Sequence, residues 1–94
     1  MSLIFEWDPN KAATNVRKHR VTFEEAATVF EDIHSITISD PDHSSGEERY
    51  LIIGASHRSR LLIVAFSERS DKLRIISARM LTQRERRQYE EIKD

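Results

Sequence analysis

Three apolar, β-rich runs follow one another over residues 49–56, 61–68 and 73–79, and only short polar segments separate them. The first separator is His57-Arg58-Ser59, which reads as a tight turn, and the second contains Asp71-Lys72. Strands joined so closely pair antiparallel, because a parallel crossover needs a dozen or more residues. The sequence therefore predicts an antiparallel meander, and the alternating run Ile36 to Asp40 is expected to be its fourth strand.

One short strand and three helices are predicted for the rest of the chain. Residues 3–7 alternate bulky side chains and stop before Pro9, which suits the first turn of a helix over 9–19. Thr22 with Glu25, and Thr82 with Glu85, have the spacing of capping boxes and predict two further helices. We expect the first two helices to form a hairpin that covers one face of the sheet. The order β-α-α-β-β-β-β-α predicts an α+β domain with a mainly antiparallel sheet packed by helices.

Size and composition narrow the class of protein. The 94 residues are enough for one domain with one core, and we expect a single domain over 1–94. The chain has no cysteine, so disulfides and thiolate metal sites are excluded and a reducing compartment is the natural expectation. Its longest apolar runs have the length of strands and no signal-peptide pattern opens the chain, so we expect a cytoplasmic protein without a membrane contact.

Charge is unevenly distributed along the chain. The net charge is −1, yet residues 1–48 hold 4 Lys or Arg against 10 Asp or Glu, while residues 49–94 hold 11 against 6. Such segregation makes a dipolar surface that steers a polyanion to one side, unless the charges mix in space once the chain folds. Arginine outnumbers lysine 11 to 4, which weakly favours bidentate anion contacts.

The last run of the meander joins an apolar strand core to arginines. By alternation, Arg74, Ile76 and Ala78 share one face of the strand. The other face is predicted to carry Leu73, Ile75, Ser77 and Arg79. Because the strand ends in Ser-Ala-Arg just before a helix start, Arg79 is expected at the rim of the sheet, available to an anion.

Several site classes do not match the sequence. The two glycines, Gly46 and Gly54, form no phosphate loop, and there is no G-x-S-x-G nucleophile elbow. The loops contain potential ligands for a hard metal ion, namely Asp40, Asp42, His43, Glu47 and His57. Their spacing matches no metal motif, and the preference of such residues for turns explains their presence better. We therefore expect neither a metal nor a cofactor.

The cations of the meander fit phosphoryl chemistry on RNA. They are Arg49, Arg60, Arg69, Arg74 and Arg79, and they are accompanied by Lys18, His19, Glu47 and Glu48. Cleavage through the ribose 2′-hydroxyl needs a base, an acid and cations that stabilise a crowded negative phosphorane, and none of these has to be a metal. Histidine or glutamate suits the base, histidine or lysine the acid, and arginine the clamp. The alternative for each residue is a surface ion pair of small energetic value.

Several motifs, in the same order and nearly end to end, resemble the BrnT toxin family. The matching pieces are Phe5-Glu6-Trp7-Asp8-Pro9-Asn10-Lys11, Asn15-Val16-Arg17-Lys18-His19, Val21-Thr22-Phe23-Glu24-Glu25-Ala26, Asp42-His43-Ser44 with Glu48-Arg49, and Arg74-Ile75-Ile76-Ser77-Ala78-Arg79 with Glu85-Arg86 and Tyr89. The patterns K-H-x-V-x-F-x-E-A and R-I-I-S-A-R are the specific ones. The resemblance implies a RelE-like α+β ribonuclease, the toxin of a type II toxin–antitoxin module.

The same resemblance implies partners. They are an RNA substrate and a BrnA-type ribbon-helix-helix antitoxin, which neutralises the toxin, dimerises and represses the shared operon, so that operator DNA is contacted only through the antitoxin. RelE-like toxins tend to be basic, whereas this chain is nearly neutral, which is compatible with reliance on the ribosome or on a local basic face. The alternative is a non-catalytic relative that acts only as the partner of a DNA-binding antitoxin.

The family's polar positions carry over to Lys18, His19, Glu48, Arg49, Arg74 and Arg79. Among these, we expect Arg49 and Arg79 to hold the scissile phosphate and His19 or Glu48 to handle the proton. Lys18 is expected to help with the backbone or the leaving group. Substrate binding is further assigned to Arg60, Arg69 and Arg74.

Overall fold

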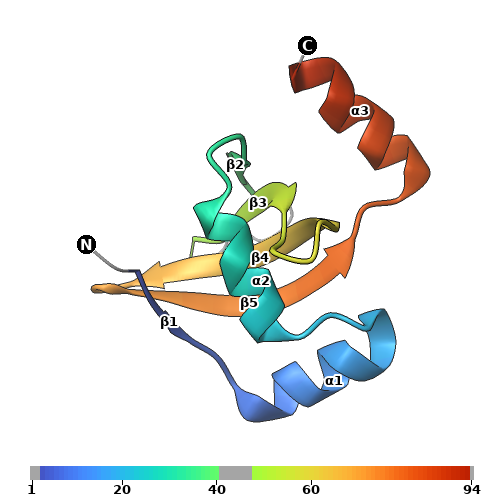
Figure 1. The fold of residues 1–94 in the computed structure, drawn as a ribbon. Helices are drawn as coiled ribbons and strands as arrows, with labels where there is room; N and C mark the ends of the chain where they lie inside the picture. The colour runs from blue at the N-terminus through green and yellow to red at the C-terminus, as the bar shows by residue number, and fades with distance from the viewer. Residues whose placement is uncertain (1–2, 41–47, 94) are drawn as a thin grey trace.

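The predicted order of helices and strands is confirmed in the structure, a computed structural model that describes residues 3–40 and 48–93 (Figure 1). The elements are β1 (Ile4–Glu6), α1 (Pro9–His19), α2 (Phe23–Thr28), the 3₁₀ turn η1 (Val29–Glu31), β2 (Ile36–Ser39), β3 (Tyr50–Ala55), β4 (Leu61–Arg69), β5 (Lys72–Met80) and α3 (Gln83–Lys93). Residues 41–47, which include the Asp42-His43-Ser44 motif, lie outside the described residues.

The five strands form one sheet in the order β1-β5-β4-β3-β2. The meander prediction is confirmed, because β2, β3, β4 and β5 pair antiparallel with their neighbours in sequence. The short strand β1 is the exception, since it pairs parallel with the beginning of β5, from Ile4 opposite Lys72 to Glu6 opposite Arg74. Beyond Arg74 that edge of β5 is no longer covered by a strand.

A bulge in β5 interrupts the alternation of its side chains. Phe66 of β4 lies opposite Ile75, whereas the preceding Ala65 lies opposite Ser77, so Ile76 is left without a cross-strand partner. An extra residue of this kind reverses the order of inward and outward side chains in the rest of the strand.

The bulge decides where the functional end of β5 points. Strict alternation predicts that Ile75 shares a face with Ser77 and Arg79, and this prediction is wrong. Ile75 and Ala78 both lie in the core, each 1% exposed. Ser77 and Arg79 consequently lie on the opposite face of the sheet, away from the core.

Helix α2 and η1 cover one face of the sheet (Figure 1). The core lies between this helical layer and the sheet. The Thr22 hydroxyl accepts a hydrogen bond from the Glu25 backbone N–H at 3.0 Å, which caps α2. The Glu25 side chain turns away from the cap, so only half of the predicted capping box forms. The helical segment supplies the core side chains Val21, Phe23, Ala26 and Val29, and the sheet supplies Ile52, Leu62, Val64, Phe66, Ile75 and Ala78.

Helix α1 lies along the edge of β5 that β1 leaves open. The buried Asn15 side chain accepts a hydrogen bond from the Ala78 N–H at 3.1 Å and donates to the Ala78 carbonyl at 2.8 Å, as a neighbouring strand would. Its amide also donates to the carbonyl of Val21 at 2.9 Å. The expected helical hairpin over one face is therefore formed differently, because α1 extends along the sheet edge and α2 lies over the face.

Helix α3 begins with a complete capping box. Thr82 N–H donates to the Glu85 carboxylate at 2.9 Å, and Glu85 N–H donates to the Thr82 hydroxyl at 3.2 Å.

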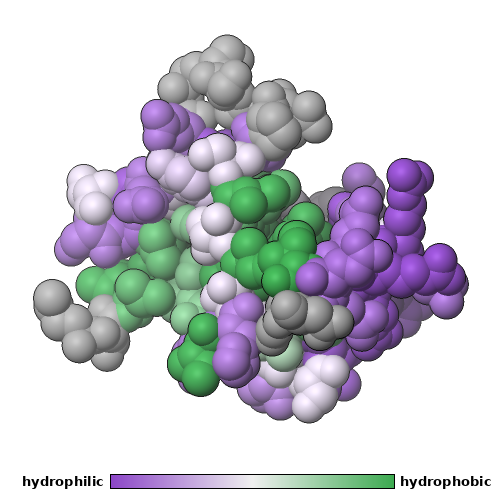
Figure 2. Space-filling model, turned by 90° about the horizontal axis from the view of Figure 1, so that it is seen from above, coloured by the Kyte–Doolittle hydropathy of each residue, from purple (hydrophilic) through white to green (hydrophobic). Residues whose placement is uncertain are grey.

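Seen from above, hydrophobic side chains gather in the middle of the molecule and hydrophilic ones along the right side (Figure 2). None of the described helices is long and apolar enough to cross a membrane.

Candidate functional site

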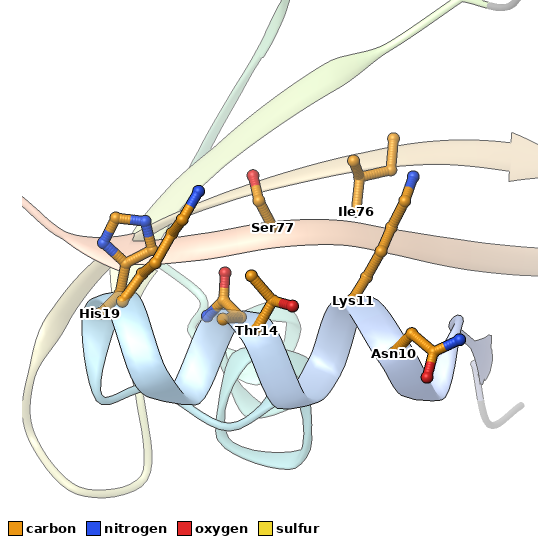
Figure 3. A pocket seen from close by; sticks show the side chains of 8 residues that line it. Asn10, Lys11, Thr14, His19, Ile76 and Ser77 are labelled. Carbon is orange, nitrogen blue, oxygen red and sulfur yellow. The ribbon is translucent and has the colours of Figure 1, made fainter.

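A cavity of about 290 Å³ opens between α1 and β5 (Figure 3). Its lining consists of Asn10, Lys11, Thr14, Asn15, Lys18, His19, Ile76 and Ser77. Lys11 and His19 rise from α1 on the side where Ile76 and Ser77 of β5 lie, at opposite ends of the view (Figure 3). The cavity has the size of a small ligand pocket, and all but one of its lining residues are polar.

Helix and strand run in the same direction along this cavity, from Asn10 to His19 and from Ile76 to Ser77 (Figure 3). The hydrogen bonds of Asn15 fix their register at Ala78. The four residues from Asn15 to His19 cover roughly 6 Å of helix, which is about two residues of a strand. His19 is thereby brought roughly level with Met80, the last residue of β5 and the one after Arg79.

The cavity is electropositive. Lys11, Lys18 and His19 line it, and no aspartate or glutamate is among its lining residues. Within the described part of the chain, no carboxylate lies within ion-pairing distance of either lysine. A cavity of this composition favours an anion over a cation or an apolar ligand.

Arg79, which is not among the residues that line this cavity, is held in a fixed orientation two positions after Ser77 in β5. Its Nη1 and Nη2 donate to the two oxygens of the Glu85 carboxylate at 2.8 and 2.9 Å, and Nη1 also donates to the carbonyl of Met80 at 3.2 Å. A guanidinium has five N–H groups, so Nε–H and the second N–H of Nη2 are left on its side edge. A side edge of this kind binds two oxygens of a phosphate at once.

Glu85 is the residue that orients Arg79. The guanidinium of Arg79 and the capping hydrogen bonds of Thr82 lower the pKa of the Glu85 carboxyl to about 2. Because this pKa is lowered, the Arg79–Glu85 pair stabilises the fold fully above pH 4.5, the ordinary pKa of a glutamate. This stabilisation is lost as the pH falls toward about 2.

We therefore expect a specific pH dependence of stability. Between pH 4.5 and 2 the melting temperature of the wild-type chain should fall further than that of Glu85→Gln, because the glutamine side chain does not take up a proton in this range. Thermal unfolding followed by circular dichroism at several pH values measures the difference. Equal losses in the two proteins would mean that the pair contributes nothing to stability.

Two other predicted substrate-binding arginines are engaged in the fold. Arg60 binds the buried Glu25 carboxylate with two nitrogens, one of them Nε at 2.9 Å, and also donates to the carbonyl of Arg20 at 3.1 Å. Arg74 pairs with Glu6 of β1 at 3.3 Å, across the parallel strand pair. Arg60 in particular has a structural role, because its guanidinium holds the Glu25 carboxylate of α2 against the turn between β3 and β4.

Glu48 and Arg49 lie in a different depression. With Ser39, Asp40 and Tyr50 they line a cavity of about 180 Å³ at the beginning of β3. The Tyr50 hydroxyl donates to Glu48 at 2.7 Å, and this hydrogen bond to a carboxylate raises the pKa of Tyr50. Glu48 is thus engaged with the tyrosine beside it.

The structure does not bring Arg49 and Arg79 into one cavity. By alternation along β3, Arg49 lies on the same face as Ile53. Ile53 pairs with Ile63 of β4, and Ile63 pairs with Arg79 of β5. Four residues along a strand and two strands across separate their Cα atoms by roughly 16 Å. Arg69 lies at the end of β4, next to the β4–β5 turn.

The residues that the sequence analysis missed are Lys11, Ser77 and Asn15. Lys11 appears in the sequence analysis only within a motif of the family resemblance. Asn15 contacts Ala78, which is 63 positions away, so no local pattern reveals its role. Among the described residues, no group of three or more histidine, aspartate or glutamate side chains is arranged to hold a metal ion. Asp42, His43 and Glu47 of the alternative metal set lie outside the described residues.

Comparisons with known proteins agree with this fold. The crystal structure of the Brucella abortus ribonuclease toxin BrnT matches with a TM-score of 0.64 and 22% sequence identity, over 87% of this chain and 100% of that chain, which shows a shared α+β fold. None of the curated proteins compared with the chain matches it. A family model described as the ribonuclease toxin BrnT of type II toxin–antitoxin systems matches residues 7–85. The chain therefore belongs to the BrnT family of ribonuclease toxins of type II toxin–antitoxin systems.

Proposed function

We propose that this ribonuclease toxin cleaves RNA without a metal ion, at the junction of α1 and β5. The observation that carries the proposal is an electropositive cavity lined by Lys18 and His19 along β5, the strand on which Glu85 holds the Arg79 guanidinium in a fixed orientation two positions after Ser77. In this arrangement Arg79 binds two oxygens of the scissile phosphate and stabilises the charge that builds up on them. Family membership supports the substrate class.

His19 is the proposed proton-transfer group, because it lines the cavity at the end of α1 that lies toward the end of β5. The ribose 2′-oxygen forms a bond to phosphorus while its proton passes to the imidazole, and the bond from phosphorus to the 5′-oxygen breaks as that oxygen gains a proton. Lys18 is placed to stabilise or protonate the leaving oxygen. The products are a 2′,3′-cyclic phosphate and a free 5′-hydroxyl.

The remaining predicted residues have supporting roles in this proposal. Glu48 and Arg49 line their own depression and are assigned to flanking nucleotides rather than to the proton transfer. Arg74 and Arg69 extend the basic surface along β5 and the β4–β5 turn. Arg60 is left out, because Glu25 occupies its guanidinium.

We infer the cellular setting from the family. Cleavage of RNA inhibits translation in the cytoplasm, and a BrnA-type ribbon-helix-helix antitoxin neutralises the toxin and contacts operator DNA. Belonging to a type II toxin–antitoxin family supports a protein antitoxin as the partner.

A cleavage assay with and without a chelator tests the proposed chemistry. An RNA oligonucleotide should be cut equally in EDTA, and a 2′-deoxy substitution at the cleaved position should stop the reaction. His19→Gln should lower the rate by a factor on the order of 10² to 10⁴, as loss of a general acid–base group does. His34→Gln, at an exposed position outside the cavity, is the matched control.

Two outcomes would contradict this mechanism. Cleavage of the 2′-deoxy substrate would exclude the ribose hydroxyl as the nucleophile, and loss of activity in EDTA would show a requirement for a metal ion. Binding of the antitoxin without any RNA cleavage by the wild-type chain would instead favour the non-catalytic relative.

A further inference from the structure

We propose that the Lys11 end of the α1–β5 cavity binds a second phosphate of the same RNA strand, next to the scissile one. This inference rests on the proposed function and extends it, because it assigns a direction to the bound strand. The RNA backbone then follows α1, from Lys18 and His19 toward Lys11. The proposal starts from the length of the cavity, which reaches well beyond the group of residues near Arg79.

The two lysines are spaced for two contacts on one strand. Lys11 and Lys18 are seven residues apart, which is close to two turns, so their side chains leave the same face of α1. Two turns correspond to roughly 10 Å along the helix axis. Both line the cavity, and the Nζ of Lys11 rises toward the side of Ile76 (Figure 3). One phosphate near His19 leaves Lys11 without a ligand, so a second anion fits at its end.

The position of Lys11 in the helix is unfavourable for the fold alone. It is the third residue of α1, within the first turn, and that turn contains no acidic residue. A cation there faces the positive end of the helix dipole, whereas anions are the stabilising charges at that end. Lys18 and His19 in the last turn are favoured by the same dipole, so helix stability explains those residues but does not explain Lys11.

The surrounding groups suit a phosphate. The Thr14 hydroxyl accepts a hydrogen bond from Arg17 at 3.2 Å, which leaves its O–H free to donate. Ser77 adds a second hydroxyl from β5, and Ile76 supplies an apolar surface for a sugar or base. The lining offers donors and no carboxylate, as an anion requires.

Lys11→Gln is the variant that tests the second subsite, and Arg87→Gln, at an exposed position of α3, is its control. For an RNA of several nucleotides, Lys11→Gln should raise KM about tenfold and leave kcat nearly unchanged, since a charged phosphate contact away from the reacting bond is lost. For a dinucleotide with one phosphodiester bond, Lys11→Gln and wild type should have the same KM. The melting temperature should stay equal or rise, because the unfavourable dipole contact disappears.

Binding of a 2′-O-methyl oligonucleotide, which cannot be cleaved through the 2′-oxygen, separates this proposal from the proposed function. Lys11→Gln should weaken binding and reduce the slope of log affinity against log salt by about 0.7, as expected for one phosphate contact to a single strand. This readout remains valid even if the wild-type chain cuts no RNA. Equal effects of Lys11→Gln on the dinucleotide and the longer RNA, or an unchanged salt slope, would overturn the second subsite.

Discussion

Replacing Arg79 by alanine is expected to lower the rate of RNA cleavage by a factor on the order of 10² to 10³, the usual cost of one preorganised donor to a developing oxyanion. The physical reason is that Glu85 and the Met80 carbonyl hold the guanidinium in one orientation and leave the N–H groups of its side edge available for the proposed phosphate contact. Single-turnover cleavage of a labelled RNA measures the loss. The fold should remain intact, because the Arg79–Glu85 pair is partly exposed and its loss removes only part of the stability.

Two variants sharpen the interpretation of this result. Arg79→Lys keeps the charge but loses the paired N–H groups of the side edge, so its rate should lie between those of wild type and Arg79→Ala. Arg84→Ala, at an exposed position in the first turn of α3, is the control and should cleave at the wild-type rate. Full activity of Arg79→Ala would remove this residue from the mechanism.

Replacing Arg60 by leucine is expected to lower the free energy of unfolding by about 3–5 kcal/mol, because it leaves the buried Glu25 carboxylate without its charge partner. The Glu25 side chain is only 3% exposed, and its other close contact is the Ser56 hydroxyl at 2.7 Å. A loss of this size is a large part of the stability of a typical domain. Urea denaturation of the folded chain measures it.

Arg58 provides the matched control for this effect. Its guanidinium lies 3.9 Å from the same carboxylate but is 63% exposed, so Arg58→Leu should change stability by less than about 1 kcal/mol. The double variant Glu25→Leu with Arg60→Leu should recover much of the loss, since apolar replacement of both partners removes the unpaired charge. Unchanged stability of Arg60→Leu would show that Arg60 is free for a role in substrate binding, as the sequence analysis had assigned it.

The comparison of Glu25 with Glu85 shows where local patterns stop being informative. Both residues follow a threonine by three positions, so both predict a capping box. At α3 the box forms completely, because Thr82 and Glu85 have each other within reach. At α2 the half-buried Arg60, from the distant turn between β3 and β4, competes for the carboxylate and binds it, since a charge in the interior requires an opposite charge.

The sequence alone determined the elements of this protein and their order. The period of apolar residues, the helix caps and the short turns are local properties, and they also determined that the meander is antiparallel. The motifs near both ends identified the family, and the arginines and His19 pointed to RNA as the substrate.

Only the tertiary structure decided which polar residues lie together. The bulge at Ile76 moves Ser77 and Arg79 to the face away from the core, and Asn15 fixes α1 against β5. The separation of Arg49 from Arg79 depends on sheet register and strand order. These features arise from contacts between segments far apart in the chain, whose energies no local pattern contains, and they determine which cations lie near one another.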